Sequence, residues 1–346
     1  MVRRLLRPLL DPYRRYRHAR LIHAVRVSLG LLATILLTTG INLPHGEWAS
    51  VTMLVVIGGL QHHGNIGKKS AERAIGTLVG AAVGLVLVVQ QSWLGMPWLT
   101  YFAMAVVCGF FSYHAIGKGG YTALLAGITV FIVAGHGDNP VTDGLWRGVD
   151  ILIGIALALA FSFALPLYAV YSWRYNLADA LRDCASLYGR IIKGQPVTDD
   201  EHLKLMGRLN TAMIQLRSLM PSVSKEVKIS MMELDAIQRH LRLCFSTLEI
   251  LGNTRPNPSD PQAMAHMQAA LSLEHRQIRV QLIGMARALK SGASQRLSRP
   301  MELPETGLDT PVYNALDGYR LLTRQLAANI SDMRKRLAKT APCWNI

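Results

Sequence analysis

Six predominantly apolar runs occupy the first half of the chain, and short polar or Gly- and Pro-containing stretches separate them. The runs cover residues 22–41, 47–62, 73–91, 97–115, 121–137 and 146–168. A helix that spans a bilayer needs about 20 mostly apolar residues. The alternative, a buried soluble bundle, does not account for six such runs in succession with almost no charge inside them. The pattern therefore predicts six transmembrane helices.

The second half of the chain shows a helical period of apolar and polar positions instead. This pattern predicts amphipathic helices near 173–194, 199–220, 224–252, 260–292 and 310–340, with breaks that include Gly194–Pro196, Pro221 and Asn253–Pro261. Such helices pack into a bundle, on themselves or on a second subunit. The expected fold is an all-α membrane protein with a basic N-terminal segment (1–21), a six-helix transmembrane domain (22–170) and a cytoplasmic helical domain (171–346).

The loops alternate in their content of Lys and Arg. Seven arginines precede the first run, and the second, fourth and final connections carry further cations, whereas the opposite connections have almost none: Arg3, Arg4, Arg7, Arg14, Arg15, Arg17, Arg20, Lys68, Lys69, Arg73, Lys118 and Arg174. Cationic loops remain in the cytoplasm. We therefore expect a multi-pass inner-membrane protein with both termini in the cytoplasm.

The net charge of +15 restricts the classes of partner. A basic excess suits nucleic acid, anionic lipid or an anionic substrate, and the apolar runs favour the last two, so no nucleic-acid partner is expected. The four cysteines have no metal-ligand spacing. Neither a phosphate loop, a nucleophile elbow nor paired carboxylates are visible, so we expect no enzyme, no cofactor and no metal.

Charged groups inside spanning segments cost roughly 2.5–3.5 kcal/mol on insertion scales and are therefore candidates for function. Glu47 begins the second run, Glu72 and Arg73 open the third, and Arg147 and Asp150 open the sixth. Structural roles are the alternative: Glu72 can stabilise a helix N-terminus, and Arg147 and Asp150 can form an ion pair at i,i+3 spacing.

Two histidines, His62 and His63, end the second run. Adjacent residues point to different faces of a helix, so a metal site is disfavoured and an interfacial or titrating role is expected. Arginines line pathways for anions. The functional hypothesis is an electropositive path, with Arg73 at the inner end and Arg147 at the outer end. Glu47, Asp150 and the histidine pair are then the groups that carry protons.

The third run contains a stripe of small residues, in which Gly76, Gly80 and Gly84 are spaced by four. Small residues at this spacing let two helices approach closely. The sequence leaves open whether the partner helix belongs to the same chain or to a second subunit.

Several of these stretches resemble the fusaric acid resistance / aromatic acid exporter family of bacterial inner-membrane proteins. The similarity lies in Pro44, Glu47–Trp48 and Val51–Met53, in residues 64–84 (GNIGKKSAERAIGTLVGAAVG), in residues 117–129 (GKGGYTALLAGIT) and in the opening Arg147, Asp150, Gly154. It covers most of residues 15–170 and continues loosely beyond them. The resemblance implies efflux of aromatic or other organic acids. Larger members carry two membrane halves, so a single half implies a homodimer, and some relatives use a periplasmic adaptor.

The leading hypothesis is a dimeric exporter of organic anions, aromatic carboxylates above all. Arg73 and Arg147 are expected to attract the carboxylate, Trp48 and Tyr121 to face its ring, and Glu72 and Asp150 to orient the arginines. A passive anion channel, similar in plan to plant malate channels, is the first alternative. The second is a membrane-anchored scaffold whose helical domain binds a partner or anionic lipid.

Overall fold

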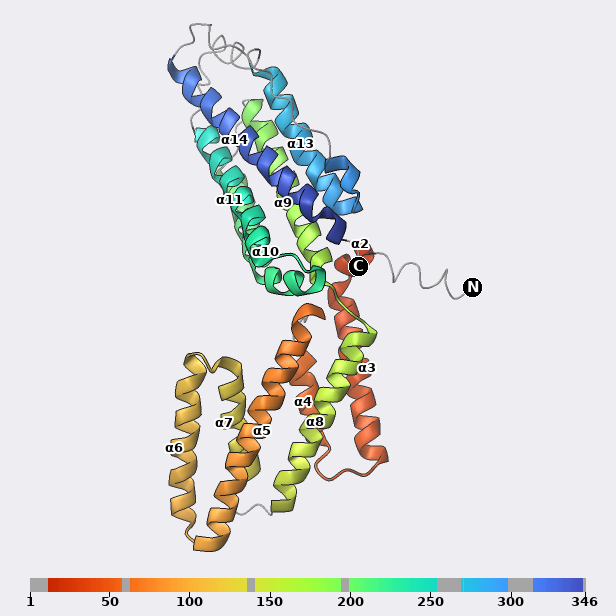
Figure 1. Cartoon of the computed structure of the whole chain (residues 1–346), viewed down its shortest axis with the longest axis vertical. Coiled ribbons are helices and arrows are strands. Elements are labelled where there is room, and N and C mark those ends of the chain that lie inside the picture. Colours follow the sequence, from red (N-terminus) through yellow and green to blue (C-terminus); the bar gives the residue numbers. More distant parts are fainter. Residues whose placement is uncertain are drawn as a thin grey trace, which may run out of the picture. The chain divides into compact units, whose positions relative to one another are not determined.

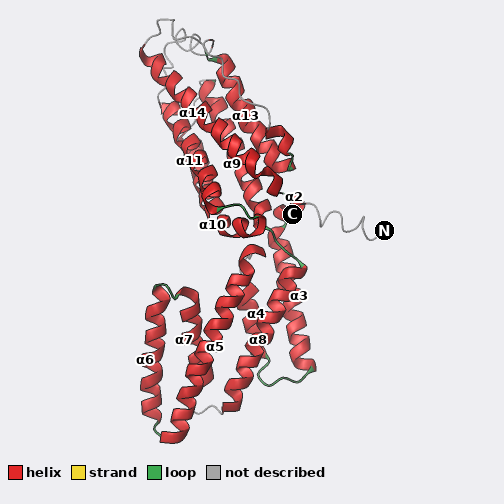
Figure 2. Cartoon of the chain, in the orientation of Figure 1, coloured by secondary structure: helices red, strands yellow, loops and turns green. Residues whose placement is uncertain are grey.

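The computed structural model describes residues 12–57, 63–135, 141–193, 199–253, 269, 271–297 and 314–344. Every regular element among these residues is helical (Figure 2). The chain divides into two compact units, of which one is Arg17–Leu167 and the other combines Met1–Tyr16 with Tyr168–Ile346. The predicted boundary at residue 170 lies close to this division. That the second unit is cytoplasmic remains a prediction.

The first unit contains helices α3 (Ala19–Gly40), α4 (Glu47–Ile57), α5 (His63–Leu94), α6 (Pro97–Ile116), α7 (Gly120–Ala134) and α8 (Val141–Ala164). Helix α7 packs between α5 and α6, and α5 also contacts α8 (Figure 1). Helices α3, α4 and α8 all contact one another. The long helices are apolar on the faces turned away from their neighbours, as expected where lipid is the solvent.

Four of these six helices, α3, α5, α6 and α8, are long and apolar enough to cross a membrane. The other two, α4 and α7, are apolar but shorter, with 11 and 15 residues. The end of the second predicted span, 58–62, and the end of the fifth, 136–137, lie outside the described residues. A spanning count of six therefore remains a prediction.

Helix α5 begins at His63, so the stretch 63–69, predicted to be part of a loop, is helical. The polar residues of this stretch favoured a loop in the prediction. In the structure Ile66 is buried at 1% exposure in a cluster with Met53 and Ile57. Burial of one apolar side chain on the inner face stabilises a turn that two glycines would otherwise disfavour.

The glycine stripe of α5 packs against α7 of the same chain, which answers the question that the sequence left open. A Cβ atom on Gly76 would lie 2.7 Å from the carbonyl oxygen of Thr122, and one on Gly80 would lie 2.5 Å from that of Ala126. A Cβ on Gly84 would lie 2.9 Å from the Cβ of Val133. The backbones of α5 and α7 can approach this closely only because these positions lack side chains.

The second unit is a bundle of α9 (Ala169–Ile192), α10 (Asp199–Val227), α11 (Met231–Asn253), α13 (Ser272–Ser291) and α14 (Asn314–Thr340). Helix α9 packs against α10, α11 and α13, and α14 packs against α11 and α13. The short α2 (Pro12–Arg17) joins this unit, where the Tyr16 hydroxyl donates to Oδ1 of Asn176 at 2.6 Å. Two short 3-10 turns, Ser294–Leu297 and Ala341–Cys343, complete it.

A break between two helices was predicted at Pro221. In the structure Pro221 lies inside α10, which continues to Val227. Proline removes one backbone hydrogen bond from a helix. Met220 and Val223, which are buried on either side of it, retain the helix through core packing. The helix predicted to begin at residue 224 instead begins at Met231, and the hydroxyl of Ser224 donates to the carbonyl of Ile229 at 2.6 Å.

Arg174 of α9 is buried at 2% exposure and binds backbone carbonyls from two distant parts of the chain. Its Nε and Nη2 donate to Leu289 O at 3.0 and 2.8 Å, and its Nη1 donates to Trp344 O at 3.0 Å. The sequence suggested only a topogenic cation here. The structure makes Arg174 the link between α9, the last turn of α13 and the C-terminal turn.

His275 of α13 and Tyr188 of α9 form a second buried polar contact, with 2.6 Å between Nδ1 and the hydroxyl oxygen. Burial disfavours the imidazolium form, and it lowers the pKa of His275 to about 4 from its ordinary value of 6.5. Burial also raises the pKa of Tyr188, so the phenol stays neutral. The contact therefore joins two uncharged groups at neutral pH.

We predict that Gly80→Ala destabilises the first unit, because the added Cβ meets the α7 backbone and neither helix can move without breaking its packing. Overpacking of this kind costs about 1–3 kcal/mol. Gly67→Ala is the matched control, since nothing lies within 4 Å of a Cβ there. Thermal denaturation of the detergent-solubilised variants, followed by size-exclusion fluorescence, should show a lower midpoint for Gly80→Ala only. Equal midpoints would contradict the assigned α5–α7 contact.

We predict that the free energy of unfolding of the second unit falls as the pH decreases from about 6.5 to about 4. The pKa of His275 is lowered in the folded chain, so within this window the unfolded chain binds a proton that the folded chain does not. The loss is at most about 3 kcal/mol. In His275→Gln the slope should be shallower, because the substituted side chain binds no proton in this window. Urea unfolding, followed by tryptophan fluorescence across pH, measures both slopes, and equal slopes would exclude the effect.

Candidate functional site

Three helices of the first unit meet at Thr52 of α4, which is fully buried. From α5, Nη2 of Arg73 donates to Oγ1 of Thr52 at 3.4 Å. From α8, Gly154 lies so close that a Cβ there would be 2.9 Å from the Cβ of Thr52 and would overlap the carbonyl oxygen of Ala49. We refer to the meeting point of Thr52, Arg73 and Gly154 as the three-helix junction.

Arg73 is 3% exposed, although it carries a full positive charge. The long contact to Thr52 is the one hydrogen bond of its side chain among the described residues, and its Nε has no partner there. Ser70 and Thr77 lie about one turn before and after it on the same face of α5, and their hydroxyls are also buried without a partner among the described residues. Buried polar groups normally have partners, so this face is suited to water or to a ligand.

Asp150 of α8 is 0% exposed, and neither of its carboxylate oxygens has a hydrogen-bond partner in the described part of the chain. It precedes Gly154 by one helical turn, so both lie on the face that meets α4. The charged groups that act on it include Glu47, the first residue of α4, and His45, in the turn before that helix. Asp150 therefore approaches the three-helix junction from the side on which α4 begins.

Arg147 does not form the predicted ion pair with Asp150. Its Nη1 donates instead to the carbonyl of Ile132, in the last turn of α7. A cation at a helix C-terminus satisfies carbonyls that lack intrahelical donors and favours the helix dipole. The structural role of Arg147 is thus to hold the end of α7 against the start of α8.

The sequence analysis expected Glu72 to orient Arg73. In the structure the carboxylate of Glu72 instead lies 3.6 Å from the ammonium of Lys68. Tyr121 begins α7 and is half-buried, with the ammonium of Lys69 6.0 Å from its ring centroid. The Tyr121 hydroxyl also lies within electrostatic range of Arg73. The structure therefore brings Tyr121 to the cationic part of α5, where Glu72 pairs with Lys68.

The remaining candidates lie at the start of α4 or cannot be placed. Glu47 is exposed and lies 3.8 Å from Nδ1 of His45, whose Nε2 lies 3.5 Å from Asp143. Trp48 is half-buried and lies one turn before Thr52 on α4. His62 lies outside the described residues; His63 begins α5, but its side chain is not described.

Two buried or interacting residues were missed by sequence reasoning. Thr52 lay inside a quoted motif but has no charge to mark it, and His45 lies in the turn before α4. Arg26 of α3, a charge about one turn into the first predicted span, was a candidate for function or for a side chain that extends to the cytoplasmic headgroups. It is 1% exposed and binds Nδ1 of His23 at 2.9 Å and the carbonyl of Leu165 at 3.5 Å, just after the end of α8.

Two buried charges determine the chemistry that this region offers: Arg73 at the junction, and Asp150 one turn of α8 before Gly154. A guanidinium has N–H donors that suit a carboxylate, and a carboxyl group can gain or lose a proton. Among the described residues, no three His, Cys, Asp or Glu side chains gather closely enough to hold a metal ion.

Two comparisons with known proteins bear on the class of this protein. The fusaric acid resistance protein family matches residues 20–341, and members of this family are typically membrane transporters. The chain is 31% identical over 282 residues to the inner membrane protein YeeA of Escherichia coli (strain K12), which covers 77% of this chain and 79% of that protein. With its apolar helices, the protein is a multi-pass protein of the bacterial inner membrane. The chain belongs to the fusaric acid resistance protein family.

Proposed function

We propose that this protein exports organic anions, in particular aromatic carboxylic acids, from the cytoplasm as a homodimer. The observation that carries the proposal is Arg73, a buried cation in a candidate span with no carboxylate partner among the described residues. A charge buried without a counter-ion is costly. A carboxylate substrate would supply that counter-ion, and Arg73 would recognise the substrate through it.

The ring of an aromatic substrate would contact the residues beside this cation. Tyr121 lies within electrostatic range of Arg73, and Trp48 lies one turn from Thr52 on α4. Aromatic side chains stack favourably on aromatic ligands. Arg147 is a weaker candidate for substrate contact than the sequence suggested, because its guanidinium already binds the end of α7.

Asp150 would couple export to protons. A carboxylate without hydrogen-bond partners, buried in a candidate span, is stabilised in its protonated form by desolvation. Loss of its proton would place an anion close to the junction and would compete with the substrate for Arg73. Alternate occupation by a proton and a substrate is the basis of coupled transport, whereas a passive channel has no use for this group.

The orientation and the assembly form part of the proposal. Both termini would be cytoplasmic, in accordance with the cationic loops. The glycine stripe of α5 is occupied by α7 of the same chain, so a homodimer would use another surface of the first unit. Transport by the purified protein alone would show that a periplasmic adaptor is not required for the membrane step.

We predict that Arg73→Gln reduces the release of 4-hydroxybenzoate from proteoliposomes by tenfold or more, because a hydrogen bond to a charged group contributes about 1.5–3 kcal/mol. Arg73→Lys should retain part of the activity. Lys68→Gln, which removes an exposed cation of the same helix, is the control and should transport normally. If Arg73→Gln transports as the parent does, the site is wrong. If the parent releases no acid from a panel, a scaffold is favoured instead.

We predict that Asp150→Asn abolishes the acceleration of release by a pH gradient at clamped membrane potential, while release down the gradient of the anion continues. The variant should be at least as stable as the parent, because it removes an unpartnered buried carboxylate. Flux measured with and without the pH gradient separates the two components. A parent protein that ignores the pH gradient would indicate the channel alternative.

A further inference from the structure

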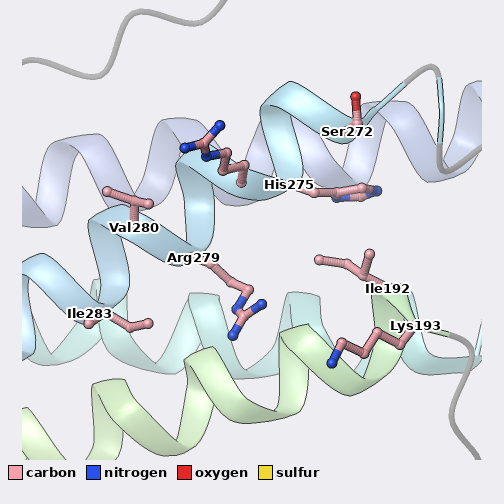
Figure 3. Close-up of a pocket in the computed structure, with 8 residues that line it drawn as sticks. Ile192, Lys193, Ser272, His275, Arg279, Val280 and Ile283 are labelled. Carbon is pink, nitrogen blue, oxygen red and sulfur yellow. The ribbon is translucent and has the colours of Figure 1, made fainter.

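A cavity of about 470 Å³ lies in the second unit, between the end of α9 and the first half of α13 (Figure 3). Ligand pockets in proteins are typically about 300–1,000 Å³, so the size suits a small organic molecule. Three cationic side chains, three aliphatic side chains, one imidazole and one hydroxyl line it: Lys193, Arg276, Arg279, Ile192, Val280, Ile283, His275 and Ser272.

The cations of this cavity are not neutralised by the protein. Lys193, Arg276 and Arg279 are exposed, and none of them forms an ion pair within the described ranges. Figure 3 shows Arg279 directed from α13 toward α9. There its Nε lies 3.4 Å from where a Cβ of Gly189 would be, so the missing side chain leaves room for the guanidinium. Acidic side chains of the same unit instead pair with other cations, as Glu201 does with Arg190.

His275 adds a buried polar atom to the lining. The side chain is 3% exposed, its Nδ1 contacts Tyr188, and its Nε2 has no partner among the described residues. The cations Lys193, Arg276 and Arg279 are therefore the donors that an anion in the cavity can reach. Ile192, Val280 and Ile283 provide the apolar wall beside these donors.

We infer that this cavity binds a small organic anion, one with a single acidic group and an apolar body. Three cations would hold the acidic group, and the aliphatic wall would cover the body. The site is distinct from the three-helix junction, because all of its residues belong to α9, α13 and the position that follows α9. It gives the second unit a ligand of its own, whether or not the first unit transports the same compound.

Titration calorimetry on the detergent-solubilised full chain tests the inference, with 4-hydroxybenzoate, its neutral analogue 4-hydroxybenzyl alcohol and inorganic phosphate as probes. All titrations use an Arg73→Gln background, so that the three-helix junction does not contribute. Arg276→Gln combined with Arg279→Gln should weaken 4-hydroxybenzoate binding by about tenfold or more. Arg287→Gln, an exposed cation of the same helix outside the cavity, is the control and should bind unchanged.

Binding of the carboxylate but not of the alcohol, lost in the double variant and retained in the control, would support the site. Equal binding of the alcohol, equal binding by the double variant, or no heat up to millimolar concentrations would overturn it. Phosphate that competes fully would also overturn it, because the apolar wall would then have no role. The substituted residues are exposed, and far-ultraviolet circular dichroism checks that the bundle is retained.

Discussion

The cost of removing a charge from water governs the arrangement of both units. In the first unit two arginines offset this cost by donating to backbone carbonyls near helix ends, where acceptors lack intrahelical donors. Arg26 donates to a carbonyl just after α8, and Arg147 donates to one in the last turn of α7. Arg174 does the same in the second unit at the end of α13. Arginine suits this task because several N–H donors diverge from one planar group. Arginines at helix ends therefore stabilise the fold by linking separate helices.

Arg73 and Asp150 depart from this rule, on two helices that both contact α4. Arg73 contacts Thr52, and Asp150 lies one helical turn before Gly154, which packs on Thr52, yet no ion pair joins the two charges. A direct pair would neutralise each of them and leave the junction chemically inert. Two separated charges, each without a partner of opposite sign in the described structure, can instead exchange partners with a substrate and a proton. The two unpaired charges thus lower the stability of the fold at the position where transport would need them.

The sequence predicted the helices better than their contacts. Apolar runs and helical periodicity located nearly every element, because both follow from which solvent each face meets. The start of α5 and the continuation of α10 through Pro221 were missed, since burial of Ile66 and Met220 decides them. Spacing suggested that Arg147 would pair with Asp150, but the carbonyl of Ile132 on another helix outcompetes the nearby carboxylate. Local patterns carry no information about such tertiary partners.

Arg174 and Trp344 are separated by 170 positions, and this separation bears on how the chain is made. During synthesis the guanidinium emerges long before its second acceptor exists, and its first acceptor, Leu289, also comes late. Until residues 289 and 344 have been synthesised, the hydrogen bonds that hold Arg174 in the folded bundle cannot form. The native environment of this side chain, which belongs to the first helix of the bundle, therefore depends on segments that the ribosome adds late.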